Sequence, residues 1–251
     1  MTASGGLDRL GGAVSVNATA HDAALTAAAL LHAASSASVK ERRRFSVALT
    51  GGTTPRPLYE LLGGDQWRGR FAWDAWEVFF SDERACPPDD EASNFHLVQR
   101  ALLDAVPVEP TRVYRMEAER HDLDAAAADY SSLMDATLPK GPPGVPRLDC
   151  ILLGLGENGH VASLFPDTPA LSVHDRWATR GRADYAPFDR ITLTFPAINA
   201  ARTIVLLVTG EAKHEALQAT AAGLTPAARV GPYDGELHWV VDSAAAGGDG
   251  P

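Results

Sequence analysis

The sequence contains very little cysteine. Cys86 and Cys150 are the only two among 251 residues, they lie far apart, and no C-x-x-C pair occurs. This scarcity argues against a disulfide framework and against a thiolate metal site. Free thiols in a reducing cytosol are the simpler interpretation, so we expect a cytoplasmic location.

A long apolar run is also missing. The first residues, "MTASGGLDRLGG", show no charged segment followed by an apolar one, and no uninterrupted apolar stretch approaches the length of a membrane span. We therefore expect no membrane partner.

Positive charge is in deficit, because 22 Lys and Arg residues face 32 Asp and Glu residues and the formal net charge is −10. This balance argues against nonspecific binding of nucleic acid or of an anionic membrane. An anionic small molecule would need a local group of cations. The hydrophobic fraction of 45% is enough for a sizeable core.

Helical and strand-like patterns alternate along the chain. Helices are predicted at residues 21–43, 55–62, 93–106, 123–138 and 211–223, and strands at 45–50, 76–80, 112–116, 148–155, 190–195, 201–210 and 236–242. Unbroken apolar strands between helices are typical of a parallel sheet covered on both faces. The predicted fold class is therefore α/β: a three-layer sandwich with a mainly parallel, Rossmann-like sheet covered by helices on both faces. We expect one domain over residues 1–251, with flexible ends at about 1–12 and 244–251.

The segment "GLGENGH", residues 154–160, contains a literal G-x-G-x-x-G in Gly154, Gly156 and Gly159. A dinucleotide fingerprint also needs a long helix after the glycines and an acidic residue at the end of the next strand. Pro166 would interrupt a long helix after the glycines, and no clear strand with a terminal acidic residue follows. The glycines are better explained by a sharp turn after a strand and a close approach to a ligand.

His160 follows those glycines at the carboxyl end of a predicted strand, where α/β folds bind their ligands. A single histidine can simply be satisfied by the local backbone. The loops after other strands make a functional role the stronger interpretation.

One such loop is "LTGGTTP". Gly51 and Gly52 permit an unusual backbone, Thr53 and Thr54 offer hydroxyls, and Pro55 stands where a helix would begin. Free N–H groups at a helix start make this loop a candidate anion cradle. A simple capped turn explains the paired glycines less well.

Two further loops carry charge. Asp82 and Arg84 directly follow a buried strand, where they are either a solvated loop or part of a cleft in which Arg84 binds phosphate. Lys213 lies in the first turn of a predicted helix, where it opposes the helix dipole unless an anion is near.

Two common hydrolase motifs are absent. "HEALQ" begins like H-E-x-x-H but has Gln218 at the last position, so we expect no metal site there. No G-x-S-x-G occurs, so a serine-hydrolase elbow is unsupported.

Taken in order, these segments resemble the 6-phosphogluconolactonase family from about Phe45 to Asp242. "LTGGTTP", "SDER" and "GLGENGHVASLFP" resemble three family motifs, and "RITLTFPAINAAR", "VTGEAKHEAL" and "HWVVDSAAA" resemble later blocks. The resemblance implies hydrolysis of 6-phospho-D-glucono-1,5-lactone to 6-phospho-D-gluconate, the second step of the oxidative pentose phosphate pathway. It also implies a fold shared with glucosamine-6-phosphate deaminases and ribose-5-phosphate isomerases, with no organic cofactor and no required metal.

The chain departs from the family pattern at three positions: Asn158 replaces a frequent Asp, Val161 a Thr, and Asp167 a common Gly. Asn158 can orient the imidazole of His160 by hydrogen bonding but cannot stabilise the imidazolium by charge. The basicity of His160 is therefore the property most affected.

The expected mechanism uses His160 as general base toward a water that attacks C1, with Asp82 orienting sugar hydroxyls or the water. Gly51–Thr54, Arg84 and Lys213 would hold the phosphate, with Arg190 a less favoured candidate. The alternatives are a glucosamine-6-phosphate deaminase or sugar-phosphate isomerase, and a non-catalytic sugar-phosphate sensor. We expect a monomer or a weak homo-oligomer.

Overall fold

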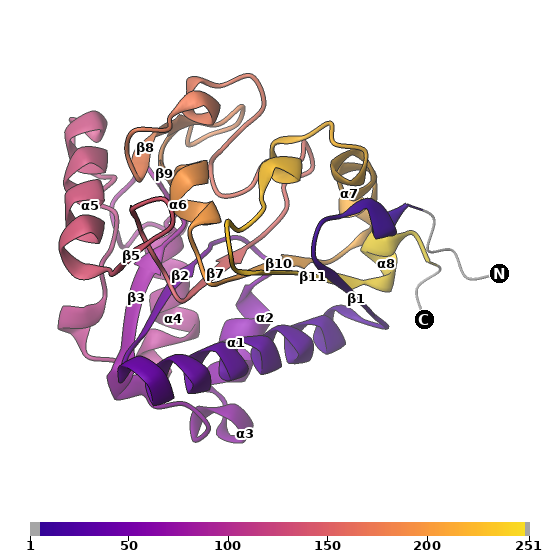
Figure 1. The fold of residues 1–251 in the computed structure, drawn as a ribbon, viewed down its shortest axis with the longest axis horizontal. Helices are drawn as coiled ribbons and strands as arrows, with labels where there is room; N and C mark the ends of the chain where they lie inside the picture. Colours follow the sequence, from indigo (N-terminus) through magenta and orange to yellow (C-terminus); the bar gives the residue numbers. More distant parts are fainter. Residues whose placement is uncertain (1–5, 249–251) are drawn as a thin grey trace.

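The computed structural model describes residues 6–248 and has a six-stranded parallel sheet at its centre (Figure 1). The order of the strands is β1-β11-β10-β7-β2-β3. Their bounds are β1 (Ala13–Asn17), β2 (Phe45–Leu49), β3 (Trp76–Phe80), β7 (Cys150–Leu153), β10 (Thr203–Val208) and β11 (Glu236–Asp242). The central strands β2 and β7 are buried along their whole length, as their uninterrupted apolar sequences predicted.

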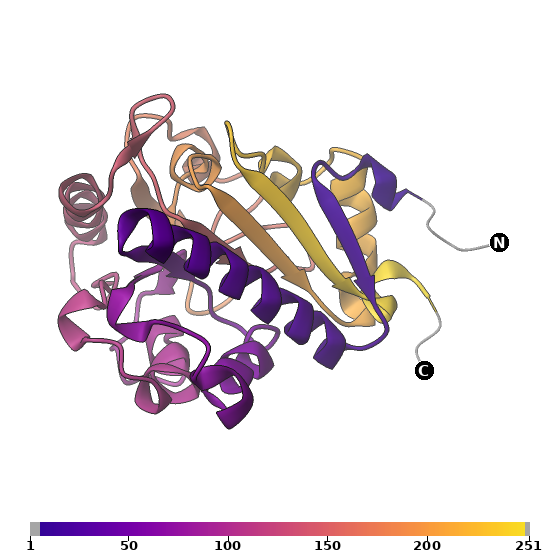
Figure 2. The same ribbon diagram turned by 60° about the horizontal axis from the view of Figure 1, so that its bottom comes forward.

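Helices cover both faces of this sheet, which confirms the predicted three-layer α/β class. The α-helices are α1 (Ala20–Arg42), α2 (Arg56–Gly63), α3 (Asp65–Arg68), α4 (Asn94–Ala101), α5 (Leu123–Thr137), α6 (Phe195–Asn199), α7 (His214–Ala221) and α8 (Ser243–Ala246). Figure 1 shows α1 to α4 below the sheet and α6 and α7 above it. Turning the molecule brings α1 forward, lying along the strands (Figure 2).

Two smaller sheets complete the fold. β4 (Asp82–Arg84), β9 (Asp189–Leu193) and β8 (Ala178–Arg182) form an antiparallel sheet in the order β4-β9-β8, against which α5 packs. β5 (Lys140–Gly141) and β6 (Val145–Pro146) form a two-stranded ribbon. Short 3-10 helices occur at Leu7–Arg9, Trp73–Ala75, Leu103–Ala105, Pro110–Arg112, Pro169–Ser172, Glu211–Lys213 and Pro226–Arg229.

The helix starts follow local capping chemistry. The side chain of Thr19 accepts a hydrogen bond from the backbone N of Asp22, and the Asp22 carboxylate accepts one from the backbone N of Thr19, so α1 begins with a capping box. Ser93 accepts a hydrogen bond from the backbone N of His96 and is the N-cap of α4.

Several strand predictions need correction. Residues 112–116 form no strand, and only Val113 makes an isolated bridge, to Val78. The strand predicted at 190–195 exists as β9, but it belongs to the small antiparallel sheet. β1 and β8 were not predicted, because their polar and small residues are held by neighbouring strands and give no continuous apolar signal.

The predicted flexible ends fall partly outside the described residues, since 1–5 and 249–251 are not covered. Within the described part, Leu7, Leu10 and Ala245 are buried in the core. No helix formed by residues 6–248 is both long and apolar enough to cross a bilayer.

Candidate active site

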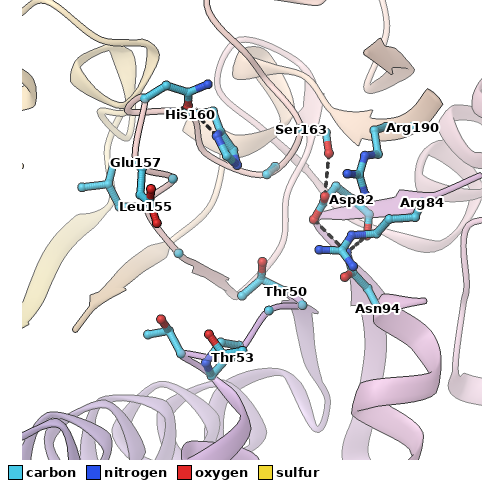
Figure 3. Close-up of a pocket in the computed structure, with 18 of the residues that line it drawn as sticks. Thr50, Thr53, Asp82, Arg84, Asn94, Leu155, Glu157, His160, Ser163 and Arg190 are labelled. Carbon is cyan, nitrogen blue, oxygen red and sulfur yellow. Dashed lines mark hydrogen bonds between the residues drawn. The ribbon is translucent and has the colours of Figure 1, made fainter. Parts of the chain in front are cut away.

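A cavity of about 480 Å³ lies at the carboxyl ends of the central strands β2, β3, β7 and β10. Its lining contains every residue predicted for the site except Gly159. Figure 3 shows His160 and Glu157 on one side, Asp82, Arg84 and Arg190 on the other, and Thr50 and Thr53 between them below. Residues as far apart in the chain as Thr50 and Lys213 therefore meet at one edge of the sheet, as parallel-strand topology requires.

The loop after β2 needs both of its glycines. A Cβ added at Gly51 would lie 1.7 Å from Oδ1 of Asn94, and Gly52 has a φ of +96°. Any other residue at 51 would displace Asn94, and a side chain at 52 would be strained. Thr53 and Thr54 then lead into α2 through Pro55, with all three residues lining the cavity.

Asp82 is held in a fixed orientation at one side of the cavity. It is 5% exposed, and its Oδ1 accepts hydrogen bonds from Ser81 Oγ and Asn94 Nδ2, both at 3.1 Å. Its Oδ2 accepts from Ser163 Oγ at 2.7 Å. One lone-pair direction of Oδ2 is still available to a ligand.

Glu83 is turned away from this function toward the start of α4. Its carboxylate accepts from the backbone N of Asn94 at 2.7 Å, the backbone N of Phe95 at 2.8 Å and Ser93 Oγ at 2.9 Å. Burial raises the pKa of Glu83, and these hydrogen bonds act against that rise. The three charges of "DER" thus have separate tasks, with the middle one structural.

Arg84 and Arg190 are direct cross-strand partners in the β4–β9 pairing. Arg190 is only 1% exposed, and its Nε and Nη1 have no hydrogen-bond acceptor among residues 6–248. The Nε of Arg84 is buried without an acceptor in the same described range. Burial and the neighbouring Arg84 lower the pKa of Arg190. The half-buried Arg84, whose Nη1 donates to the carbonyl of Ala92, and the buried Arg190 thus present donors without a protein acceptor, an arrangement that can bind an anion.

Lys213 reaches the cavity from the opposite side of the site. It lies at the end of a 3-10 helix directly before α7, so the sequence placed it about one turn too far into the helix. Its Nζ is 3.9 Å from Oε1 of Glu157, a residue that sequence reasoning missed.

His160 is positioned by Asn158 and Phe165. Nδ1 of His160 is 2.6 Å from Oδ1 of Asn158, and the imidazole stacks on the Phe165 ring with centroids 3.9 Å apart. The same Oδ1 accepts the backbone N–H of His160 at 3.2 Å. Because Oδ1 is an acceptor, Nδ1 must carry the proton, and Nε2 is the basic nitrogen.

The charge state of His160 follows from its surroundings. Burial lowers its pKa to about 4, Asp82 and Asp184 act to raise it, and Lys213 and Arg190 act to lower it further. The imidazole is therefore neutral at neutral pH and able to accept a proton.

The three glycines of "GLGENGH" have different roles, and only Gly156 makes room for the histidine. A Cβ at Gly156 would lie 2.0 Å from Nδ1 of His160. Gly159 has a φ of +76°, and its Cβ would lie 2.3 Å from the Thr225 side chain. Gly154 meets no atom within 4 Å and has no such constraint. No long helix follows, since the next element after β7 is the 3-10 helix at Pro169–Ser172.

The two other departures from the family motif have local explanations. Val161 is fully buried in the core and does not line the cavity, so replacing Thr by Val at this position removes no hydroxyl from the site. Asp167, where a glycine is common, has a φ of 59°, which explains why glycine suits that position.

Nine lining residues were not predicted as part of the site: Thr50, Pro55, Asn94, Leu155, Glu157, Ala162, Ser163, Asp184 and Tyr185. Ser163 lies within "ASLFP" and Glu157 within "GLGENGH", so motif context could have indicated them. Asn94, Asp184 and Tyr185 carry no local signal, because only the packing of α4 and of the β8–β9 hairpin brings them to the cavity.

Comparison with known proteins gives consistent results. The family model for glucosamine-6-phosphate isomerases/6-phosphogluconolactonase matches residues 18–239. A 6-phosphogluconolactonase of Nostoc sp. is 37% identical over 211 residues, covering 82% of this chain and 85% of that protein. The structure of 6-phosphogluconolactonase from Trypanosoma cruzi is 26% identical, covers 95% of this chain and 97% of its own, and has a TM-score of 0.84.

A monomeric glucosamine-6-phosphate deaminase has the same fold, with a TM-score of 0.78 at 22% identity over 94% of this chain and 99% of its own. The fold alone therefore does not separate the two activities. The match of the family model over most of the sequence and the identity to the Nostoc protein settle the broader question: this chain belongs to the glucosamine-6-phosphate isomerase/6-phosphogluconolactonase family.

Proposed function

We propose that this protein hydrolyses 6-phospho-D-glucono-1,5-lactone to 6-phospho-D-gluconate in the oxidative pentose phosphate pathway. One observation carries the proposal: a neutral imidazole with Nε2 as its basic nitrogen lines the same cavity as two arginines with free donors. The relatives named 6-phosphogluconolactonase support the same activity.

The chemistry requires a base, a water and an acid in sequence. His160 Nε2 takes a proton from water as the water oxygen attacks the C1 carbonyl and forms a tetrahedral intermediate. The intermediate collapses by breaking the bond between C1 and the ring oxygen. The imidazolium returns its proton to that oxygen, so the products are a carboxylic acid and a free hydroxyl.

The phosphate supplies the binding energy that positions C1. Arg84 and Arg190 bind phosphate oxygens through donors that have no protein acceptor, together with Lys213 and the Gly51–Thr54 loop. Arg190 therefore becomes a principal phosphate ligand in this proposal, although the sequence ranked it below Arg84 and Lys213. Asp82 uses its remaining lone pair to orient a sugar hydroxyl or the water.

The proposal uses side chains and water only. No group of three or more His, Cys, Asp or Glu residues within 6–248 is arranged to hold a metal ion. The active form in this proposal is a monomer or a weak homo-oligomer. The free thiols Cys86 and Cys150 support the proposed cytoplasmic location.

The test measures lactone hydrolysis, corrected for the spontaneous reaction, beside ammonia release from glucosamine-6-phosphate. We expect lactone hydrolysis without ammonia release, and a kcat/KM for the phosphorylated lactone far above that for unphosphorylated gluconolactone. Ammonia release would identify the deaminase alternative. Binding of sugar phosphate with neither reaction would identify the sensor, and equal kcat/KM for the two lactones would remove the phosphate-binding assignment.

A further inference from the structure

The amide of Asn158 links His160 to a carboxylate that is distant in sequence. Asn158 Nδ2 donates to Oδ2 of Asp184 at 3.1 Å, while its Oδ1 lies 2.6 Å from Nδ1 of His160. Asp184 is 26 residues from Asn158 and lines the same cavity. The three side chains therefore form a continuous hydrogen-bonded series that ends at the base.

The direction of this series is determined by the backbone. The N–H of His160 donates to Oδ1 of Asn158, so this atom is the amide oxygen and Nδ2 is the amide nitrogen. The amide nitrogen needs an acceptor, which Asp184 provides. If Asp184 were lost, nothing in the series would oppose rotation of the Asn158 amide except its contacts with His160.

Asp184 is delivered by the hairpin between β8 and β9. A hydrogen bond from the backbone N of Ala183 to the carbonyl of Phe188, at 2.7 Å, closes the hairpin. Its neighbour Tyr185 makes an edge contact with Phe165 at 5.8 Å between centroids, and Phe165 stacks on His160. The hairpin thus contacts the base by two routes.

We propose that Asp184 is a positioning residue for lactone hydrolysis, holding Asn158 so that His160 keeps its proton on Nδ1, and supplying the negative charge that stabilises the imidazolium formed during the reaction. Asp184 thereby supplies, behind Asn158 in the hydrogen-bonded series, the carboxylate that Asn158 itself lacks. This inference rests on the proposed function.

Other charged groups also surround His160, and the test must separate them from Asp184. Asp82 lies on β4, Arg190 on β9, and Lys213 before α7 with its partner Glu157. None of these four charged groups is hydrogen bonded to Asn158 within residues 6–248. An effect on the tautomer of His160 that is transmitted by the Asn158 amide therefore reports on Asp184.

The first experiment compares Asp184→Ala and Asp184→Asn with Asp175→Asn. Asp175 is the control because its side chain is 73% exposed, pairs with Arg176 and does not line the cavity. For Asp184→Ala, kcat should fall on the order of 10-fold with KM within about twofold of the wild type. Asp184→Asn should lose less, because an amide can still accept from Asn158, and Asp175→Asn should match the wild type.

Nitrogen NMR of His160 provides a readout that does not depend on any substrate. The wild type should show the proton on Nδ1, and Asp184→Ala should shift the population toward the Nε2-protonated form. The pKa of His160 should fall in both Asp184 variants, because a charge that favours the imidazolium is removed. An unchanged tautomer and pKa would overturn the proposal even if the lactonase activity is confirmed.

Exchanging the two residues gives the sharpest test. Asn158→Asp alone places two carboxylates in hydrogen-bond contact, whereas Asn158→Asp with Asp184→Asn keeps one amide and one carboxylate in reversed order. The pKa of His160 should be higher in the exchanged protein than in the wild type, and its kcat should exceed that expected from multiplying the two single losses. Losses that simply multiply would mean that the two positions act independently. A protein with normal NMR behaviour but no lactone hydrolysis would instead refute the proposed function alone.

Discussion

At the amino ends of the central strands, Arg42 and Arg202 both face the carboxylate of Asp149, whereas at the carboxyl ends Arg84 and Arg190 face each other. Asp149 is 4% exposed, its Oδ1 lies 2.8 Å from Nη2 of Arg42 and 3.4 Å from Nε of Arg202. Its Oδ2 accepts from the backbone N and the Oγ of Ser46, at 2.9 and 3.0 Å.

The opposite edge has no such compensation. Neither Arg84 nor Arg190 has a carboxylate within 4.0 Å in the part of the chain that the structure describes. The difference teaches that arginine side chains shielded from solvent have two uses at the two ends of this fold. The arginines that pair with Asp149 stabilise the fold. Arg84 and Arg190 keep donors without an acceptor, and these donors can bind an anionic ligand.

Removing the base should give the largest effect. His160→Ala should lower kcat by roughly 10²–10⁴, the usual contribution of a positioned general base, while stability and phosphate affinity stay near normal. The measurement is steady-state lactone hydrolysis beside thermal unfolding. His21→Ala on the exposed start of α1 is the control. A less stable variant with normal turnover would show that His160 is structural.

Breaking the amino-end cluster should act on stability instead. Asp149→Ala should cost about 3 kcal/mol of unfolding free energy, because it leaves two arginine side chains and the Ser46 N–H without their acceptor. Denaturant unfolding measures the loss, and Asp135→Ala, which removes an exposed pair with Lys140, should cost less than about 1 kcal/mol. Lowered kcat/KM at full stability would mean that this cluster belongs to the site.

The carboxyl-end arginines should show the reverse pattern. Arg190→Met keeps the apolar volume and removes the charge. The transition-state stabilisation measured by kcat/KM for the phosphorylated lactone should therefore fall by about 2 kcal/mol, while the free energy of unfolding is kept or increased. Arg180→Ala on β8, whose guanidinium pairs with Asp189, is the control. A large loss of stability with unchanged kcat/KM would place Arg190 in the structural class.

The pH profile should show the smallest effect of the series. A lowered pKa means that His160 loses its basic form only at more acid pH, so the acid limb of kcat/KM should lie near pH 4. Between pH 7 and pH 5 kcat/KM should therefore change by only about 10%, whereas with a histidine of ordinary pKa it would fall about 25-fold. A limb between pH 6 and 7 would show that burial does not control the base.

Much of the fold was predictable, because the strands that make its centre have continuous apolar sequences. β2, β3, β7, β10 and β11 all lie where the apolar runs placed them. The sheet membership of β9 was not predictable, since a buried strand gives the same pattern in either sheet. That one error has consequences for the site, because β9 carries Arg190 opposite Arg84.

By itself the sequence determined the local geometry of the site. Gly52 and Gly159 adopt positive φ angles, and a Cβ at Gly156 would collide with His160 four residues later. These constraints act between residues close in the chain, so a short motif is enough to encode them, whereas the contacts of Gly51 with Asn94 and of Gly159 with Thr225 depend on the fold.

Only the tertiary structure decided which charges meet. The pairing of Arg84 with Arg190, the hydrogen bond from Ser163 to Asp82 and the contact of Asp184 with Asn158 join residues 106, 81 and 26 positions apart. Their energies depend on distance and on exclusion of water, which strand register and hairpin packing set and no short motif contains.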